Sequence, residues 1–109
     1  GAEAAGPPNF SLVEVIGCLT PGPNQRWTLT NASEPMPTKD ETATQGALAG
    51  AASKPLGSQT FDLVSVSPSM SPESHRTHKV AARGLLYRDS KYAELNLTAL
   101  DEIGTTCTR

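Results

Sequence analysis

Hydrophobic and polar residues alternate along short stretches of this chain, which is the pattern of β-strands that bury one face. The segment RWTLTNA (26–32) places Trp27 and Leu29 on one face and threonines on the other. The segment TFDLVSVS (60–67) alternates in the same way. Three further segments are dense in Val, Ile and Leu, which favour strands. The pattern predicts five strands, at residues 10–20, 26–32, 60–67, 78–88 and 94–99.

Glycines interrupt two of the long predicted strands. Gly17 and Gly84 both lie in mid-strand, where a glycine marks a bulge, a sharp bend or a close approach of another segment. Beyond the last strand the hydrophobic spacing changes, because Leu100 and Ile103 are three positions apart. That spacing predicts a single helical turn after the strand.

A long interruption, residues 33–59, separates the second and third predicted strands. It is rich in Pro, Gly, Ala and Thr and supplies little to bury. Its segment DETATQGALAGAA predicts a short helix capped by Asp40, although Gly46 and Gly50 each cost up to about 1 kcal/mol. We interpret these residues as an excursion over the sheet, since a long loop in a compact domain is usually functional or mobile.

The strand pattern predicts an all-β fold, a small five-stranded closed barrel of the oligonucleotide/oligosaccharide-binding (OB) type with a partly helical excursion between its second and third strands. An open sandwich is the alternative, because it has the same strands and differs only in their pairing. Residues 1–9 are expected to be a flexible lead-in and residues 10–109 a single domain. Trp27, Phe10 and Phe61 are the expected large core residues.

Composition and charge limit the classes of function that the chain is expected to have. Hydrophobic residues make up 37% of the 109-residue chain, and the net charge is −2. Nucleic acid is an unlikely partner, because the cations near the C-terminus are interspersed with Asp89 and Glu94. No stretch approaches the roughly 18 apolar residues of a membrane span. The start, GAEAAGPPNF, has no charged or apolar signal-peptide region, so these 109 residues are expected to lack one, as after its removal from an exported protein.

The two cysteines, Cys18 and Cys107, lie near opposite ends of the chain and form no CxxC pair. The favoured interpretation is one long-range disulfide, which suits a small exported domain. Two buried free thiols, which behave as small hydrophobic groups, are the alternative.

Both histidines lie in SPESHRTHKV (71–80), at the start of a predicted strand. His75 and His78 are three positions apart, so in an extended chain their side chains point to opposite faces. A turn would bring them together, with Glu73 as a third ligand, but the spacing matches no common zinc motif. We therefore expect solvated loop histidines, no metal and no cofactor.

Catalytic signatures are equally weak. The chain has no G-x-S-x-G elbow, and a cysteine inside an apolar strand is a poor nucleophile. Asp101 and Glu102 are adjacent carboxylates, but neighbours in sequence diverge in space, and glycoside hydrolysis needs two that converge. The sequence favours a protein that is not an enzyme, with a small hydrolase using dispersed carboxylates as the alternative.

Aromatic and cationic residues gather in LLYRDSKY, at the turn before the last strand. Tyr87, Arg88, Lys91 and Tyr92 are the candidate ligand-binding residues, because rings and cations suit a sugar or an extended polymer. The simpler interpretation is that Tyr87 closes one end of the barrel and the charges keep an edge soluble.

The order VIGCLT, RWTLTNA, GSQTFDLVSV, HKVAARGLLYR and ELNLTALDEIGTTC, over about residues 12–107, resembles a family of uncharacterised exported bacterial proteins. The resemblance implies an exported OB-like barrel and brings no catalytic residue. The expected function is therefore a non-catalytic binding or scaffold module of the bacterial cell envelope, periplasmic or secreted. A polysaccharide or a protein of the envelope is the expected partner.

Overall fold

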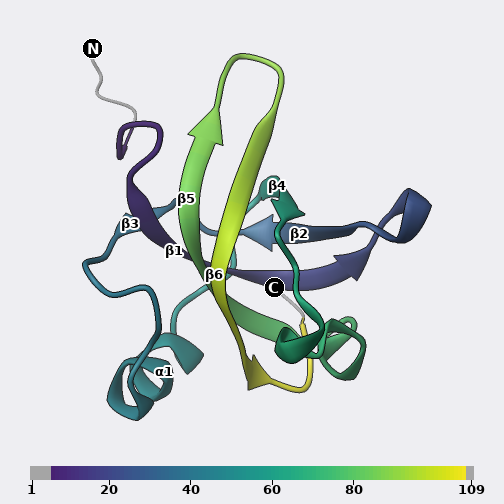
Figure 1. Ribbon diagram of the computed structural model, residues 1–109. Coiled ribbons are helices and arrows are strands. Elements are labelled where there is room, and N and C mark those ends of the chain that lie inside the picture. The colour runs from purple at the N-terminus through teal and green to yellow at the C-terminus, as the bar shows by residue number, and fades with distance from the viewer. Residues whose placement is uncertain (1–5, 108–109) are drawn as a thin grey trace.

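The computed structural model describes residues 6–107, which are 45% strand and 18% helix. Residues 1–5 of the expected lead-in and residues 108–109 lie outside the described residues. The strands are β1 (Leu12–Pro21), β2 (Trp27–Ala32), β3 (Met36–Pro37), β4 (Gln59–Val64), β5 (Lys79–Arg88) and β6 (Ala93–Gly104). The helical segments are α1 (Gln45–Ala52) and three short turns, η1 (Pro23–Gln25), η2 (Pro68–Met70) and η3 (Pro72–His75) (Figure 1).

Five of the strands form a ring. The sheet order is β2-β4-β6-β5-β1-β3, and a further pairing of β2 with β1 joins the two sides. Neighbours in the ring are antiparallel except β4 and β6, which run parallel. All five correspond to predicted strands. The sixth strand, the two-residue β3, was not predicted; it pairs with β1 outside the ring.

The strand β1 belongs to both sides of the ring because it bends. Residues 12–18 pair with β5 and residues 18–21 with β2. Gly17 lies at the change of partner, and a Cβ there would be 2.6 Å from Cγ of Leu29. The sequence offered a bulge or a close approach at this glycine; the register against β5 is continuous, and the close approach is what the structure has.

The helical turn predicted near Leu100 and Ile103 is wrong, because β6 continues as a strand past both residues. Its register against β5 shifts between Leu97 and Ala99, so Thr98 is an extra residue in the ladder. Such a bulge turns the following side chain back toward the same face. Leu97 and Leu100 therefore both face the interior, whereas Ile103 packs against the second apolar cluster on the outer side, so the spacing of Leu100 and Ile103 joins opposite faces of one strand.

Gly84 lies beside this bulge, and a Cβ there would collide with the backbone carbonyl of Asn96. We expect Gly84→Ala to lower the free energy of unfolding by about 1–3 kcal/mol, because strand backbone has to move. Gly46→Ala is the matched control, since no atom lies within 4 Å of that Cβ in α1. Alanine favours a helix, so this control should be neutral or stabilising by up to about 1 kcal/mol. Urea unfolding of both variants measures the difference, and equal effects would contradict the packing argument.

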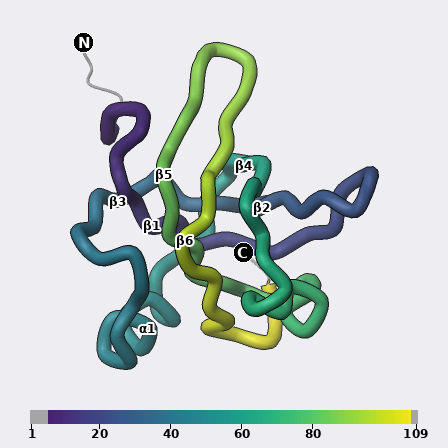
Figure 2. The backbone as a smooth tube through the Cα atoms, viewed as in Figure 1, coloured from purple at the N-terminus to yellow at the C-terminus, as the bar shows by residue number. Residues whose placement is uncertain are grey.

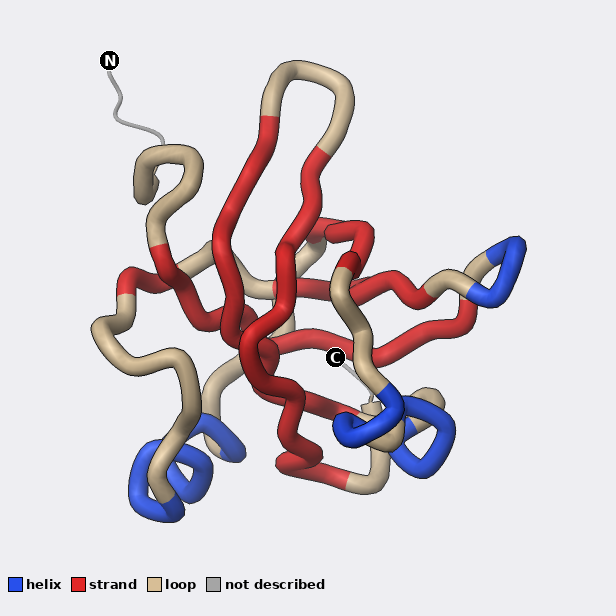
Figure 3. Tube along the Cα trace, viewed as in Figure 1, coloured by secondary structure: helices blue, strands red, loops and turns tan. Residues whose placement is uncertain are grey.

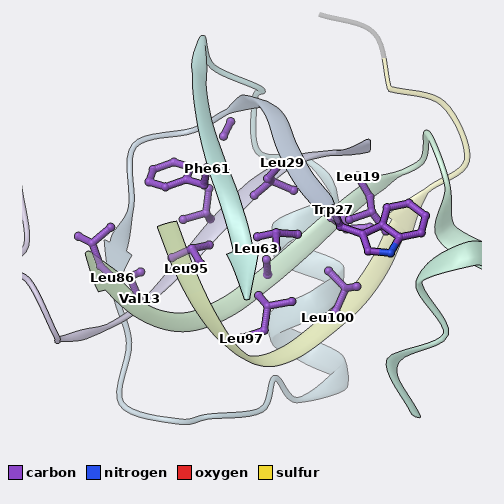
Figure 4. Packing of buried hydrophobic residues seen from close by; sticks show 14 residues of the cluster. Val13, Leu19, Trp27, Leu29, Phe61, Leu63, Leu86, Leu95, Leu97 and Leu100 are labelled. Atoms are coloured by element: carbon purple, nitrogen blue, oxygen red, sulfur yellow. The ribbon is translucent and has the colours of Figure 1, made fainter. Parts of the chain in front are cut away.

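The main core fills the ring with side chains that meet from all five strands (Figure 4). It consists mostly of Leu and Val, with Trp27 and Phe61 as the large members. Phe10 is not in this core, contrary to the prediction; it is 72% exposed, and its ring centroid lies 5.8 Å from that of Tyr87 with the two rings tilted. It precedes β1, whose buried run is residues 13–19, and its φ of 69° is outside the extended conformation of a strand.

The excursion between β2 and β4 covers one outer side of the ring. Its helix α1 packs Ala51 on Ile16 of β1 and Ala81 of β5, in a small second cluster of apolar residues. The helix was predicted, but its cap is Thr44, whose hydroxyl accepts a hydrogen bond from the Ala47 amide, and not Asp40. Figures 2 and 3 show the excursion as mostly loop, with α1 as its one regular helix.

A buried ion pair anchors the excursion. Arg83 of β5 donates to Glu14 of β1 at 3.0 Å, and both residues are 7% exposed. The same guanidinium donates to the Thr38 hydroxyl at 2.8 Å and to the Asp40 carbonyl at 2.9 Å. Lys79 adds a second anchor by donating to the carbonyl of Ala52 at the end of α1. Strand cations thus hold a segment that has little apolar surface of its own.

The predicted disulfide is confirmed. Cys18 and Cys107 are bonded, with their Cα atoms 5.7 Å apart, and the described residues contain no free cysteine. Cys18 lies on the outer side of β1 and is buried. The bond ties the segment that follows β6 to the middle of the first strand.

Candidate functional site

The outer surface of the ring differs between its two sides. The side formed by β1 and β5 lies under the excursion, as described above. On the other side, register aligns Thr28 of β2, Asp62 of β4 and Glu94 of β6 in one outward row, because Thr28 pairs with Asp62 and Asp62 with Glu94. Tyr87 of β5 continues this row opposite Glu94. All four side chains are partly exposed, so this side offers a polar surface to a ligand.

A groove of about 490 Å³ lies at the end of this surface, where β2 begins and β4 ends, and Asp62 is the member of the outward row that lines it. Residues 25–27, 62–68 and 72 line it, so the loop after β1 and the loop after β4 form its walls. A second hollow of about 530 Å³ continues from it and shares Gln25, Arg26 and Trp27. Both are open clefts with mixed polar and apolar walls, which suits an extended polar ligand more than a small apolar one.

The four predicted hairpin residues divide between two surfaces. Tyr87 and Tyr92 lie on the outward face, whereas Arg88 is in phase with the buried Leu86 at one end of the ring. Lys91 lies at the exposed hairpin tip, where its amide donates to the Asp89 carboxylate. The hairpin projects well beyond the ring (Figure 1).

Arg88 is engaged in holding one end of the ring. Its guanidinium donates to Glu34 at 2.8 Å and to the side-chain carbonyl of Gln59 at 3.1 Å. The hydrogen bond from Arg88 holds the pKa of Glu34 below its ordinary value. The backbone amide of Arg88 also donates to Asn9, so the chain is attached to β5 from this asparagine onward. The structure therefore does not join Arg88 to the two tyrosines in one cluster.

Carboxylates accompany the two tyrosines instead. The hydroxyl of Tyr92 donates to Glu94 at 2.6 Å, and that of Tyr87 donates to Asp89 at 3.2 Å. The hydrogen bond to Glu94 raises the pKa of Tyr92 to about 12, and the charge of Asp89 raises the pKa of Tyr87. Both phenols therefore stay protonated at neutral pH. Tyr92 is 39% exposed, so its ring can contact a ligand.

The two histidines lie together in a turn, the arrangement that the sequence left open, and their side chains are 22% and 30% exposed where solvated loop histidines were expected. The η3 turn brings the Nδ1 atoms of His75 and His78 to 3.0 and 2.6 Å from one oxygen of Glu102. Hydrogen bonds from His78 and then His75 hold the pKa of Glu102 below its ordinary value. Glu73, the carboxylate considered from the sequence, pairs with Arg76 instead.

Sequence reasoning missed Glu102 as the partner because it lies 24 and 27 positions from the histidines, with no local signal. Among residues 6–107, no group of three or more His, Cys, Asp or Glu residues is arranged to hold a metal ion. Asp101 and Glu102 pair with consecutive residues of β5 and so point to opposite sides of β6. The two carboxylates do not converge on one substrate position.

None of the helices within residues 6–107 is long and apolar enough to cross a membrane. No protein-family model, no curated protein and no solved structure matches the chain.

Proposed function

We propose that the ring is an OB-like barrel and that the protein is a non-catalytic binding module. The proposal draws on the order of strands around the ring, β1-β2-β4-β6-β5. Neighbouring strands are antiparallel except the parallel pair β4–β6. OB barrels bind extended polymers on the face of their second and third strands, between the loop after the first strand and the last hairpin. In this chain those elements are β2, β4, residues 22–26 and the β5–β6 hairpin.

The single observation that carries the proposal is the groove on this face. The excursion covers the β1–β5 side, whereas the β2–β4 side keeps a cleft bordered by Trp27 and Asp62 and lies next to the exposed ring of Tyr92. Asp62 lines the groove and pairs with Glu94, which accepts the hydrogen bond of the Tyr92 hydroxyl, so this support for the proposal comes from strand register.

The charge of this surface favours a neutral polysaccharide as the ligand. Asp62, Asp89 and Glu94 give it more carboxylates than cations, with Arg26 and Lys91 as the cations nearby. A polyanion such as nucleic acid would meet repulsion, since its binding depends on cations that neutralise phosphates. Tyrosine rings stack on sugars, and carboxylates accept hydrogen bonds from sugar hydroxyls.

An exported location follows from the same proposal. Disulfides persist in oxidising compartments, and the Cys18–Cys107 bond spans most of the chain. We place the module in the bacterial cell envelope, periplasmic or secreted, where polysaccharides are abundant. The alternative of a small hydrolase is less favoured, because the lowered pKa of Glu102 keeps it ionised and unsuited to donate a proton.

The test measures binding of cellohexaose and chitohexaose by isothermal titration calorimetry. Replacing both Tyr87 and Tyr92 by Ala should weaken binding at least about tenfold, because each lost stacking contact is worth about 1–3 kcal/mol. Met36→Ala is the matched control; it removes another exposed apolar side chain, 55% exposed, from the edge strand β3. Its affinity should equal that of the wild type.

Equal binding by the double tyrosine variant, or tighter binding of a single-stranded thymidine oligonucleotide than of either sugar, would contradict the proposal. Sugar hydrolysis that disappears on replacing Asp101 or Glu102 would favour the hydrolase instead.

A further inference from the structure

The loop between β4 and β5 is attached at several points. Val66 and Met70 pack against the main core near its start. Near its end, the Thr77 amide donates to the Leu19 carbonyl at 2.8 Å. Between these points lies η3, the segment that carries His75 and contributes Pro72 to the groove wall.

Glu102 is placed to hold this middle segment. It pairs with Val80, whose side chain is fully buried, so Glu102 shares the inward phase of Leu100 at one end of the ring. Its oxygen accepts hydrogen bonds from both histidines, at 2.6 and 3.0 Å. Because an ionised carboxylate only accepts, each imidazole donates from a protonated Nδ1. Two donors on one acceptor join η3 and the end of the loop to β6.

We propose that His75, His78 and Glu102 form an acid-released clamp that fixes the β4–β5 loop over one end of the ring and thereby sets the shape of the adjoining groove. Its effect on ligand binding rests on the proposed function, whereas the clamp itself does not. The surface groove and the end of the ring share one loop, so a change in the clamp reaches the groove through Pro72.

The other charged groups around the clamp have partners of their own. On the loop, Glu73 and Arg76 pair at 3.3 Å. On β5, the ammonium of Lys79 donates to the carbonyls of Ala52 and Lys54. On β6, Asp101 points to the opposite side of the strand from Glu102. The charge state of the clamp is therefore governed by its own three side chains.

The pH dependence of the clamp follows from the direction in which the pKa of Glu102 is shifted. Hydrogen bonds from the histidines lower the pKa of Glu102, so its folded pKa lies below that of the unfolded chain. The stability that this adds is present above the unfolded pKa and is lost as the pH falls through the folded one. In acid the carboxyl gains a proton, so the clamp loses the anion that accepts from both histidines.

Backbone amide hydrogen exchange tests the clamp without a ligand. The reporters are the amides of Arg76 and His78, which donate within the turn to Glu73 and His75. At neutral pH, Glu102→Gln should accelerate their exchange about tenfold over the wild type, as local opening becomes easier. Asp101→Asn is the matched control, since it removes the neighbouring carboxylate of the same strand, and it should leave these amides unchanged.

The acid arm compares the variants below the usual range of a glutamate pKa. There the protection factors of these amides in the wild type should fall to those of Glu102→Gln, whereas with both histidines replaced by Ala the protection factors at positions 76 and 78 should not change with pH. Circular dichroism confirms that each variant keeps its strands. Equal exchange in wild type and Glu102→Gln at neutral pH, or equal acceleration by Asp101→Asn, would overturn the clamp.

Acrylamide quenching of the single tryptophan, Trp27, tests the link to the groove, because Trp27 lines both hollows. Quenching should rise in Glu102→Gln and not in Asp101→Asn. Faster loop exchange with unchanged quenching would refute the link to the groove. Oligosaccharide binding that survives in both variants while exchange changes would likewise separate the clamp from the binding site.

Discussion

Replacing Cys18 and Cys107 by Ala is expected to lower the free energy of unfolding by about 4.6 kcal/mol on the chain-entropy model, within the range of about 2–5 kcal/mol for native disulfides of small domains. The bond closes a loop across a sequence separation of 89 residues, so the unfolded chain loses much freedom when it is present. It also attaches the segment after β6 to the outer side of β1, which is buried at Cys18.

Urea unfolding of the double variant and of the oxidised wild type gives the size of this effect. Thiol titration of the denatured, unreduced wild type should find no free thiol. Reduced wild type is the control for the substitutions themselves, and it should match the double variant. Two titratable thiols, or equal stability with and without the bond, would contradict the prediction.

Arg83→Met is the second substitution with a large expected effect. It removes one partner of the buried pair with Glu14, and leaving a buried charge unpaired costs about 3–5 kcal/mol. Lys54, whose ammonium lies 3.7 Å from Glu14, retains part of the compensation and is half exposed. The expected loss in free energy of unfolding is therefore toward the lower end of that range.

Two further variants distinguish the loss of the buried ion pair from the effect of replacing any arginine. Arg76→Met breaks an exposed pair with Glu73 and should cost at most about 1 kcal/mol. The double variant Glu14→Leu with Arg83→Met removes both charges and should recover much of the stability. In both variants that lack Arg83, the backbone amides of residues 38–42 should exchange faster than in the wild type, because Arg83 also donates to Thr38 and Asp40. A single Arg83→Met variant as stable as the wild type would contradict the argument.

Local patterns sufficed for the strands of the ring. Alternation assigned Trp27, Leu29, Phe61 and Leu63 to buried faces, and all four are buried. A single pair of distant cysteines led to the disulfide. The strands were predicted from residues that are close in sequence, and the disulfide was predicted because the chain has only two cysteines.

The hydrophobic pattern gave a wrong prediction where the regular alternation of a strand is interrupted or ends. The bulge at Thr98 arises from pairing with β5 and turns Leu100 to the interior, whereas Ile103 packs on the outer side, so the spacing that suggested a helical turn joins opposite faces of one strand. Phe10 lies just before the paired region, so its hydrophobicity alone did not bury it. Periodicity records which side a residue faces only while the strand stays regular.

The candidate site depended even more on tertiary structure. The sequence grouped Tyr87, Arg88, Lys91 and Tyr92 by their proximity along the chain, but the pleat sends Arg88 to the side opposite the tyrosines. Asp62 joins Glu94 only because β4 lies parallel to β6.

The sequence by itself determined the five strands of the ring, favoured the covalent link between Cys18 and Cys107 and showed no familiar catalytic motif. Only the tertiary structure decided that Glu14 is neutralised by Arg83 and that Glu102 receives both histidines. The physical reason is that hydrophobic alternation acts between neighbours in the chain, whereas a charge is stabilised by whichever partner the fold brings within hydrogen-bond distance. Such partners lie tens of residues away; strand pairing selects Arg83 for Glu14, and the η3 turn brings the histidines to Glu102.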